Sequence, residues 1–234
     1  MMVGSRWVVI AFALAILSLN EAAAESDAQQ AVQSLKEQWA EVFYLMPADQ
    51  QGPKLDQFLT RAKALVERYP KAAEPLLMEA LVLCSQAGSQ GGLAALSRVR
   101  EARDVLTRAI SLDPLAMEGS AFVMLGNLYY RLPGWPLSFG DDHLARQYLE
   151  TALRHFPNEL DTNYFYGDFL LDQGQFEQAL IYLEKAEKAP VRADSRLSDL
   201  KLKQELKPAL KDAREKNTAR ASFFSRFLSS LKNR

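Results

Sequence analysis

The strongest constraint on the fold is a fixed spacing of small and large residues in the second half of the chain. Gly167 and Ala179 are twelve residues apart, and Leu183, Ala186 and Pro190 follow at helical spacing. A repeating unit of two antiparallel helices has small residues where its helices cross, a large residue between them and a proline at its end. On the first helix the pattern is completed by Asn163, Tyr166 and Leu170. The segment 160–190 is therefore predicted to be a helix-turn-helix unit.

The turn of this unit is predicted at 172–175, where the sequence reads DQGQ. Gly174 suits the left-handed backbone that often follows the last residue of a helix. Gly167 and Ala179 are predicted to lie where the two helices cross, because a larger side chain there would push the helices apart.

A second copy of the pattern precedes the first and contains an insertion. Its first helix is marked by Phe122, Leu125, Gly126 and Tyr129, and its second by Ala145, Leu149, Ala152 and Pro157. Gly126 and Ala145 are nineteen residues apart instead of twelve. The seven additional residues fall in RLPGWPLSFGDD, residues 131–142, whose prolines and glycines prevent a continuous helix. This stretch is predicted to be an enlarged turn, and Asp141 is predicted to cap the next helix.

Two more second-helix patterns lie upstream. One comprises Ala102, Leu106, Ala109 and Pro114, with a first helix over 74–85 and a long flexible turn over 87–96. The other comprises Phe58, Ala62, Leu65 and Pro70, with a first helix over 28–45. The chain is thus predicted to be all-α, a tetratricopeptide-like α-solenoid of about four helix pairs with a C-terminal capping helix over 195–216.

The N-terminal segment is interpreted as a targeting signal. Arg6 precedes a 13-residue apolar run over 7–19, and Ala22 and Ala24 flank Ala23 in an A-x-A cleavage pattern. The run is shorter than the roughly 20 residues that span a bilayer, so a cleaved secretory signal is favoured over an uncleaved anchor. The predicted organisation is a signal peptide over 1–24, a repeat domain over 25–194 and a C-terminal helix with a basic tail over 195–234. A periplasmic location is expected.

Residues of the two clearest units resemble a known family. NYFYGDFLLDQG (163–174) together with LPGWPLSFGDD (132–142) is similar to the TatT component of TRAP transporters. The resemblance implies a periplasmic helical-repeat protein that works with an extracytoplasmic substrate-binding protein on an apolar ligand. Members of that family are often lipoproteins, whereas this sequence has no cysteine near residue 24.

The sequence offers little for catalysis or metal binding. Cys84 is the single cysteine, and His143 and His155 are the two histidines, so neither a disulfide nor a clustered zinc site is expected. Asp141 and Asp142 are interpreted as helix-start residues rather than as a carboxylate pair. The signatures of common hydrolases and nucleotide-binding loops do not occur. We therefore predict no cofactor, no metal and no enzymatic activity, and the net charge of −1 argues against nucleic-acid binding.

A candidate binding surface is suggested by aromatic residues that the repeat does not require. Such residues form the core in many helical stacks, but in a solenoid the first helix of each unit lines the concave face. Pro133 and Pro136 stiffen the enlarged turn, which predicts either a lid over that face or a structural plug. The candidate site comprises Tyr129, Tyr130, Trp135, Phe139, Asn163 and Tyr164.

The tail over 218–234 is basic and amphipathic. Phe223, Phe224, Phe227, Leu228 and Leu231 share one face of a helix, and arginines and lysines surround them. Such a helix suits either weak contact with an anionic membrane surface or a cap on the repeat stack, which we favour. The predicted function is an exported, non-enzymatic binding protein. The alternative is a repeat scaffold for assembling a cell-envelope complex, without a ligand of its own.

Overall fold

The computed structural model describes residues 26–90 and 92–217, and within these ranges the chain forms helices and no strands. The predicted signal peptide over 1–24 and the predicted amphipathic tail over 218–234 lie outside the described residues. The elements in chain order are a helix over 26–45, η1 (Ala48–Gln50), α2 (Gly52–Arg68), α3 (Glu74–Gln90), α4 (Gly92–Leu112), α5 (Ala116–Arg131), α6 (Asp142–His155), α7 (Leu160–Asp172), α8 (Phe176–Lys188), η2 (Ala193–Ser195) and α9 (Arg196–Glu215).

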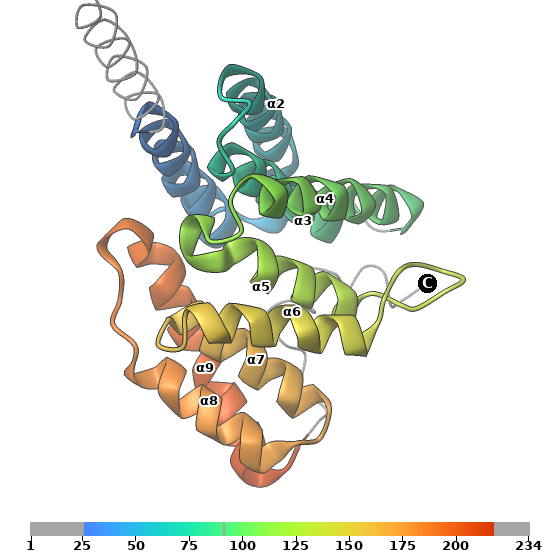
Figure 1. Cartoon of the computed structure of the whole chain (residues 1–234), viewed down its shortest axis with the longest axis vertical. Coiled ribbons are helices and arrows are strands. Elements are labelled where there is room, and N and C mark those ends of the chain that lie inside the picture. The colour runs from blue at the N-terminus through green and yellow to red at the C-terminus, as the bar shows by residue number, and fades with distance from the viewer. Residues whose placement is uncertain (1–25, 91, 218–234) are drawn as a thin grey trace, which may run out of the picture.

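Consecutive helices pack as pairs, so the predicted solenoid is confirmed (Figure 1). The most extensive contacts join α3 with α4, α5 with α6, and α7 with α8. The helix over 26–45 forms the first pair with α2, and Arg61 of α2 donates to Gln38 of that helix over 2.8 Å. The first helices of successive units also touch, α3 with α5 and α5 with α7, and together they form an inner layer.

The second helix of each unit is amphipathic and buries one stripe. In α6 this stripe is Ala145, Leu149 and Ala152, and α8 repeats it; all of these side chains have 0% exposure. The first helices are buried on more than one side, because they contact both their own partner and the neighbouring units. Almost every residue of α7 is buried as a result.

The crossing points predicted from the sequence are confirmed. A methyl group at Gly126 would lie 2.5 Å from the Cγ atom of Leu149, and one at Gly167 would lie 2.8 Å from the Cγ atom of Leu183. These distances are shorter than any normal carbon–carbon contact, so a side chain at either glycine would force the two helices of its unit apart.

The tight turn between α7 and α8 is also as predicted. Gly174 has a φ of 70° and follows Gln173, the residue that ends α7. The amide of Gly174 donates to Leu171 O, and the amide of Gln175 donates to Leu170 O. This pair of hydrogen bonds is the Schellman arrangement that satisfies the last carbonyl groups of a helix.

The flexible turn predicted over 87–96 is wrong. The first helix continues to Gln90 and the next begins at Gly92, so most of this stretch is helical. Ala87 and Ala95 are fully buried, which explains why both helices extend toward each other. Gly92 has a φ of 58° and marks the reversal of the chain.

The last helix caps the stack, as predicted. Leu206, Ala209 and Leu210 of α9 are buried, and α9 packs against α8 and α7. The segment before α9 then reaches the other end of the solenoid: Gln33 of the first helix donates to Asp194 O over 2.6 Å. In Figure 1 the orange segment after α8 accordingly runs back toward the blue N-terminal helix.

Candidate binding site

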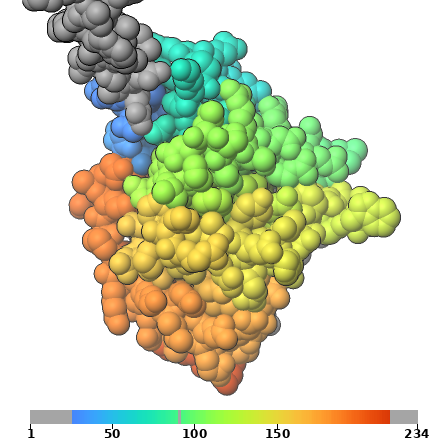
Figure 2. All heavy atoms as spheres, in the orientation of Figure 1, coloured from blue at the N-terminus to red at the C-terminus, as the bar shows by residue number. Residues whose placement is uncertain are grey.

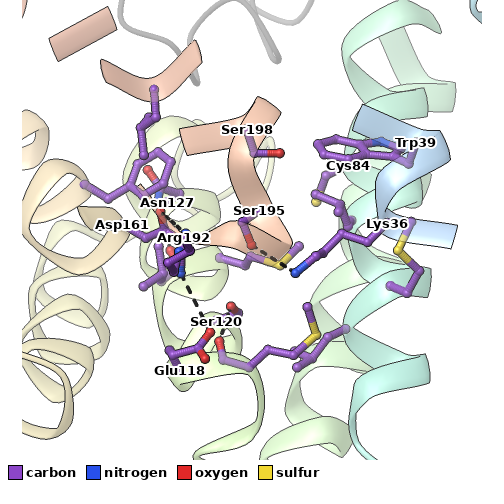
Figure 3. A pocket seen from close by; sticks show the side chains of 18 of the residues that line it. Lys36, Trp39, Cys84, Glu118, Ser120, Asn127, Asp161, Arg192, Ser195 and Ser198 are labelled. Atoms are coloured by element: carbon purple, nitrogen blue, oxygen red, sulfur yellow. Dashed lines mark hydrogen bonds and ion pairs between the residues drawn. The ribbon is translucent and has the colours of Figure 1, made fainter. Parts of the chain in front are cut away.

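A cavity of about 160 Å³ lies on the inner side of the solenoid. Its walls come from the helix over 26–45, from α3, α5 and α7, and from the segment 192–202. Figure 3 shows these elements around the cavity, with Ser195 and Ser198 on one side and Trp39 and Cys84 on another. The cavity therefore exists because the C-terminal segment folds back across the first helices of all four units.

Most of the wall is apolar and rich in sulfur. Met78, Met117 and Met124 line it, together with Cys84 and Phe165. Methionine side chains are flexible and polarisable, so a wall of this kind adapts to apolar groups of different shapes. Burial raises the pKa of the Cys84 thiol to about 12, so this sulfur stays protonated near neutral pH.

The backbone is unusual where α5 meets the cavity. Met117 and Glu118 have φ values of 47° and 51°, and Gly119 follows with a φ of 69°. Residues other than glycine rarely adopt this left-handed conformation, which costs about 1–2 kcal/mol per residue. Both side chains line the cavity, so the strained turn supplies part of its wall.

One end of the cavity is closed by ion pairs around Arg192. Its Nη2 atom lies 2.9 Å from Asp161 Oδ2 and 2.7 Å from Asp199 Oδ1, and its Nη1 atom lies 3.7 Å from Glu118 Oε2. Burial raises the pKa values of the Asp161 and Glu118 carboxyl groups, and the Arg192 charge opposes that effect. The cluster ties α5, α7 and α9 together at the cavity wall.

A second polar contact closes the cavity toward the first helix. The Lys36 Nζ atom donates to Ser195 Oγ over 3.0 Å and lies 3.6 Å from Asp194 Oδ2. Figure 3 shows the contact between Lys36 and Ser195 beside the cavity. The charged groups of the wall are thus paired with one another.

One polar side chain in the wall is different. Asn127 has 0% exposure, and its Nδ2 atom donates to Val123 O over 2.8 Å. Its Oδ1 atom accepts no hydrogen bond in the described structure. A buried acceptor that protein groups leave unused therefore belongs to a residue of the cavity wall.

The enlarged turn brings two of the predicted site residues together. The rings of Tyr129 and Phe139 meet edge to face at 5.3 Å, and Tyr129 also stacks on Tyr148 at 5.6 Å. Arg103 of α4 lies over the Phe139 ring at 4.8 Å. Phe139 therefore anchors the turn to the preceding unit.

Trp135 belongs to the same turn and is 90% exposed. Figures 1 and 2 show this turn projecting from the body of the molecule. None of the residues 132–141 lines the cavity. The hypothesis that Trp135 belongs to a lid over Tyr130, Asn163 and Tyr164 is wrong, and so is the alternative of a structural plug, because an exposed side chain covers nothing.

The other predicted site residues are inside the helix packing. The Tyr130 hydroxyl donates to Asp168 Oδ2 over 3.0 Å. The Asn163 amide donates to Pro157 O and Glu159 O over 2.9 and 2.8 Å, which fixes the start of α7. Tyr164 has 0% exposure. These three residues face the core, where two neighbouring units meet, and do not form a surface.

Sequence reasoning missed the residues that do line the cavity. Lys36, Asp161 and Arg192 carry no recognisable motif, because they meet only when the segment after α8 folds back. Asn127 had a detectable signal. It follows Gly126 just as Asp168 follows Gly167, so both are polar residues next to a helix crossing.

Within residues 26–90 and 92–217, no group of three or more histidine, cysteine, aspartate or glutamate side chains is placed to hold a metal ion. In the same ranges, no helix combines the length and apolar character needed to cross a membrane.

Comparison with known proteins supports the repeat interpretation. A family model described as Tetratricopeptide repeat matches residues 139–203, which include α6, α7 and α8. A comparison with curated proteins finds no match. The fold and the family match define a tetratricopeptide-like helical-repeat protein, a class that typically provides scaffolds for protein–protein interaction.

Proposed function

We propose that this chain is an exported, non-enzymatic binding protein that holds an apolar ligand in its inner cavity and works with a periplasmic protein partner. The observation that carries the proposal is the cavity itself, enclosed by the first helices of all four units and by the segment 192–202. Concave, mostly apolar sites with a few placed polar groups are typical of small-molecule binding.

The partner that we propose is the substrate-binding protein of a TRAP-type transport system. The support is the resemblance of residues 125–186 to the TatT component. The partner class is thus drawn from sequence, and the apolar ligand from the character of the cavity wall.

The chemistry of the cavity wall favours binding over catalysis. Its charged groups are paired with opposite charges, as in the contacts of Arg192 with Asp161 and of Lys36 with Asp194. The Cys84 thiol, with a pKa of about 12, is a poor nucleophile near neutral pH. A non-enzymatic role agrees with the tetratricopeptide-like class.

Cys84 provides a direct test of the ligand site. It lies in the cavity wall and is buried, so a small neutral thiol reagent such as methyl methanethiosulfonate must enter the cavity to react with it. Ligand extracted from the periplasm is expected to slow labelling of the native protein and to leave labelling of the denatured protein unchanged. Equal labelling rates with and without extract, at a pH where the native protein without extract is labelled measurably, would refute a ligand in this cavity.

The partner and the location need separate tests. A tagged full-length protein expressed in its own host is expected to appear in the periplasmic fraction with a mature N-terminus at Glu25, as mass spectrometry would show. It is also expected to co-purify with a TRAP-type substrate-binding protein. An intact Met1 would contradict export with cleavage, and co-purification with a different envelope complex would favour the alternative.

The alternative function, a scaffold for a cell-envelope complex, has an observation of its own. Trp135 and Leu137, which belong to the projecting turn, are 90% and 66% exposed. Exposed tryptophan is common in protein interfaces. A scaffold would lose its partner when Trp135 is removed and would show no ligand-dependent protection of Cys84.

A further inference from the structure

The unused acceptor of Asn127 specifies what the cavity takes. Asn127 is completely buried, and its Nδ2 atom is held by Val123 O, so the Oδ1 atom is fixed on the other side of the amide. A buried carbonyl oxygen without a donor destabilises a protein, because it has lost its hydrogen bonds to water and gained none. Because Asn127 lines the cavity, a ligand that brings a donor would remove this cost.

Other polar groups around the cavity are already engaged. Lys36 contacts Ser195, Arg192 contacts three carboxylates, Ser120 donates to Met117 O, and the Trp39 indole donates to Ser85 Oγ over 2.9 Å. Since the cations and anions of the wall are paired, a charged ligand would have to displace an existing ion pair. A neutral ligand has no such cost.

The volume limits the size of the ligand. An apolar cavity of roughly 150 Å³ takes up benzene in another protein, and this cavity has about 160 Å³. The wall contains the rings of Trp39 and Phe165 and the sulfur atoms of three methionines. Aromatic rings and methionine sulfur both make favourable contacts with an aromatic group.

We infer that the cavity takes a small neutral aromatic molecule, or the aromatic end of a longer one, whose N–H or O–H group donates to Asn127 Oδ1. The inference rests on the proposed function, because it names the ligand class of the same cavity. The apolar wall would hold the ring, and the single acceptor would select ligands that carry a donor.

Indole and benzofuran separate the two contributions. They have nearly the same shape, but indole carries an N–H donor and benzofuran carries an ether oxygen. Titration calorimetry with the full-length mature protein is expected to show indole binding about tenfold more tightly than benzofuran, because benzofuran leaves Asn127 Oδ1 without a donor.

Variants then assign the preference to one residue. Asn127→Leu removes the acceptor with little change in size and is expected to bind indole and benzofuran equally. Met124→Leu, one helical turn away in the same wall, is the matched control and should keep the preference for indole. If Asn127→Leu does not fold, Asn127→Ala serves, because the ratio of the two affinities within one variant does not depend on the volume of the cavity.

Each result has a definite meaning. Equal binding of indole and benzofuran to the unmodified protein would overturn the role of Asn127 and leave an apolar cavity. A preference for indole that survives in Asn127→Leu would also overturn it. If neither compound binds, the inferred ligand class is overturned, whereas the proposed function fails only if periplasmic extract also leaves the labelling of Cys84 unchanged.

Discussion

The α5–α6 and α7–α8 units share one core and differ in their turns. Gly126 packs on Leu149 in the first, and Gly167 packs on Leu183 in the second. In α7–α8 the helices are joined by a tight turn through Gly174, and in α5–α6 by the projecting segment 132–141. The packing of a repeat is therefore independent of the length of its turn, so the turn is free to carry a different function.

The two units also differ at the residue that directly follows the glycine of the helix crossing, Gly126 in α5 and Gly167 in α7. Asp168 accepts hydrogen bonds from Tyr130 and Arg131, so it joins α7 to α5. Asn127, at the matching place, lines the cavity and keeps an unused acceptor. One buried polar position thus joins two units in one case, and in the other lies at the cavity for which we propose a ligand.

The largest expected effect comes from breaking the joint between the two units. Asp168→Ala leaves Arg131, whose side chain is 7% exposed, as a buried cation without its closest carboxylate. Removing one partner of a buried pair typically costs about 3–5 kcal/mol. Because Asp172 lies 3.6 Å from the same guanidinium group and keeps part of the pairing, we expect urea unfolding to show a loss of about 3 kcal/mol in the free energy of unfolding.

The matched control for this variant is Asp172→Ala. Asp172 contacts the same arginine, but its side chain is 41% exposed, so it should contribute less than about 1 kcal/mol. Equal losses in the two variants would contradict a special role for Asp168.

The next effect compares the two crossings directly. Alanine at Gly126 would place its methyl carbon 2.5 Å from Leu149, and alanine at Gly167 would place it 2.8 Å from Leu183. Overpacking of this kind costs about 1–3 kcal/mol, and Gly126→Ala should lie at the upper end. Gly52→Ala is the control, because a methyl group there has no neighbour within 4 Å. Thermal melting that ranks Gly126→Ala with Gly52→Ala would show that the helices do not cross there.

A smaller effect distinguishes the two turns. Gly174 has a φ of 70° and open space around it, so Gly174→Ala should cost about 1–2 kcal/mol through backbone strain alone. Gly174→Asn should cost less, because asparagine tolerates the left-handed region.

In the enlarged turn, Gly140→Ala meets backbone instead, since its methyl carbon would lie 2.0 Å from Leu132 O. It should therefore open the base of that turn, which a change in Trp135 fluorescence would report; Gly174→Ala should leave that fluorescence unchanged.

The sequence predicted the parts of the structure that follow from helix periodicity. The spacing of Gly167, Ala179 and Leu183 repeats along a helix, so it determines which residues cross and where each pair ends. The stretch 87–96 was misread because Gly91 and Gly92 suggest a loop, whereas the burial of Ala87 and Ala95 favours helix.

The site could not be predicted in the same way. Lys36 and Ser195 are 159 residues apart in the sequence but in contact in the structure. No local sequence pattern indicates that the segment after α8 returns to the first helix. The direction of the enlarged turn was equally hidden, because its residues have no periodicity. Phe139 contacts Arg103 on the preceding unit, whereas Trp135 is 90% exposed and does not line the cavity.

The smallest expected effect on stability separates the two aromatic residues of the enlarged turn. Phe139 packs on Tyr129 and lies under Arg103, so Phe139→Ala should cost about 1–2 kcal/mol through lost ring contacts. Trp135 is 90% exposed, so Trp135→Ala should change the free energy of unfolding by no more than about 0.5 kcal/mol.

Thermal melting of both variants, followed by indole titration and partner co-purification, tests the difference. Trp135→Ala is expected to bind indole normally, since the turn does not line the cavity. Loss of the partner with unchanged indole binding would assign protein contact to the turn of α5–α6, whereas a large loss of stability would mean that Trp135 packs on the fold after all.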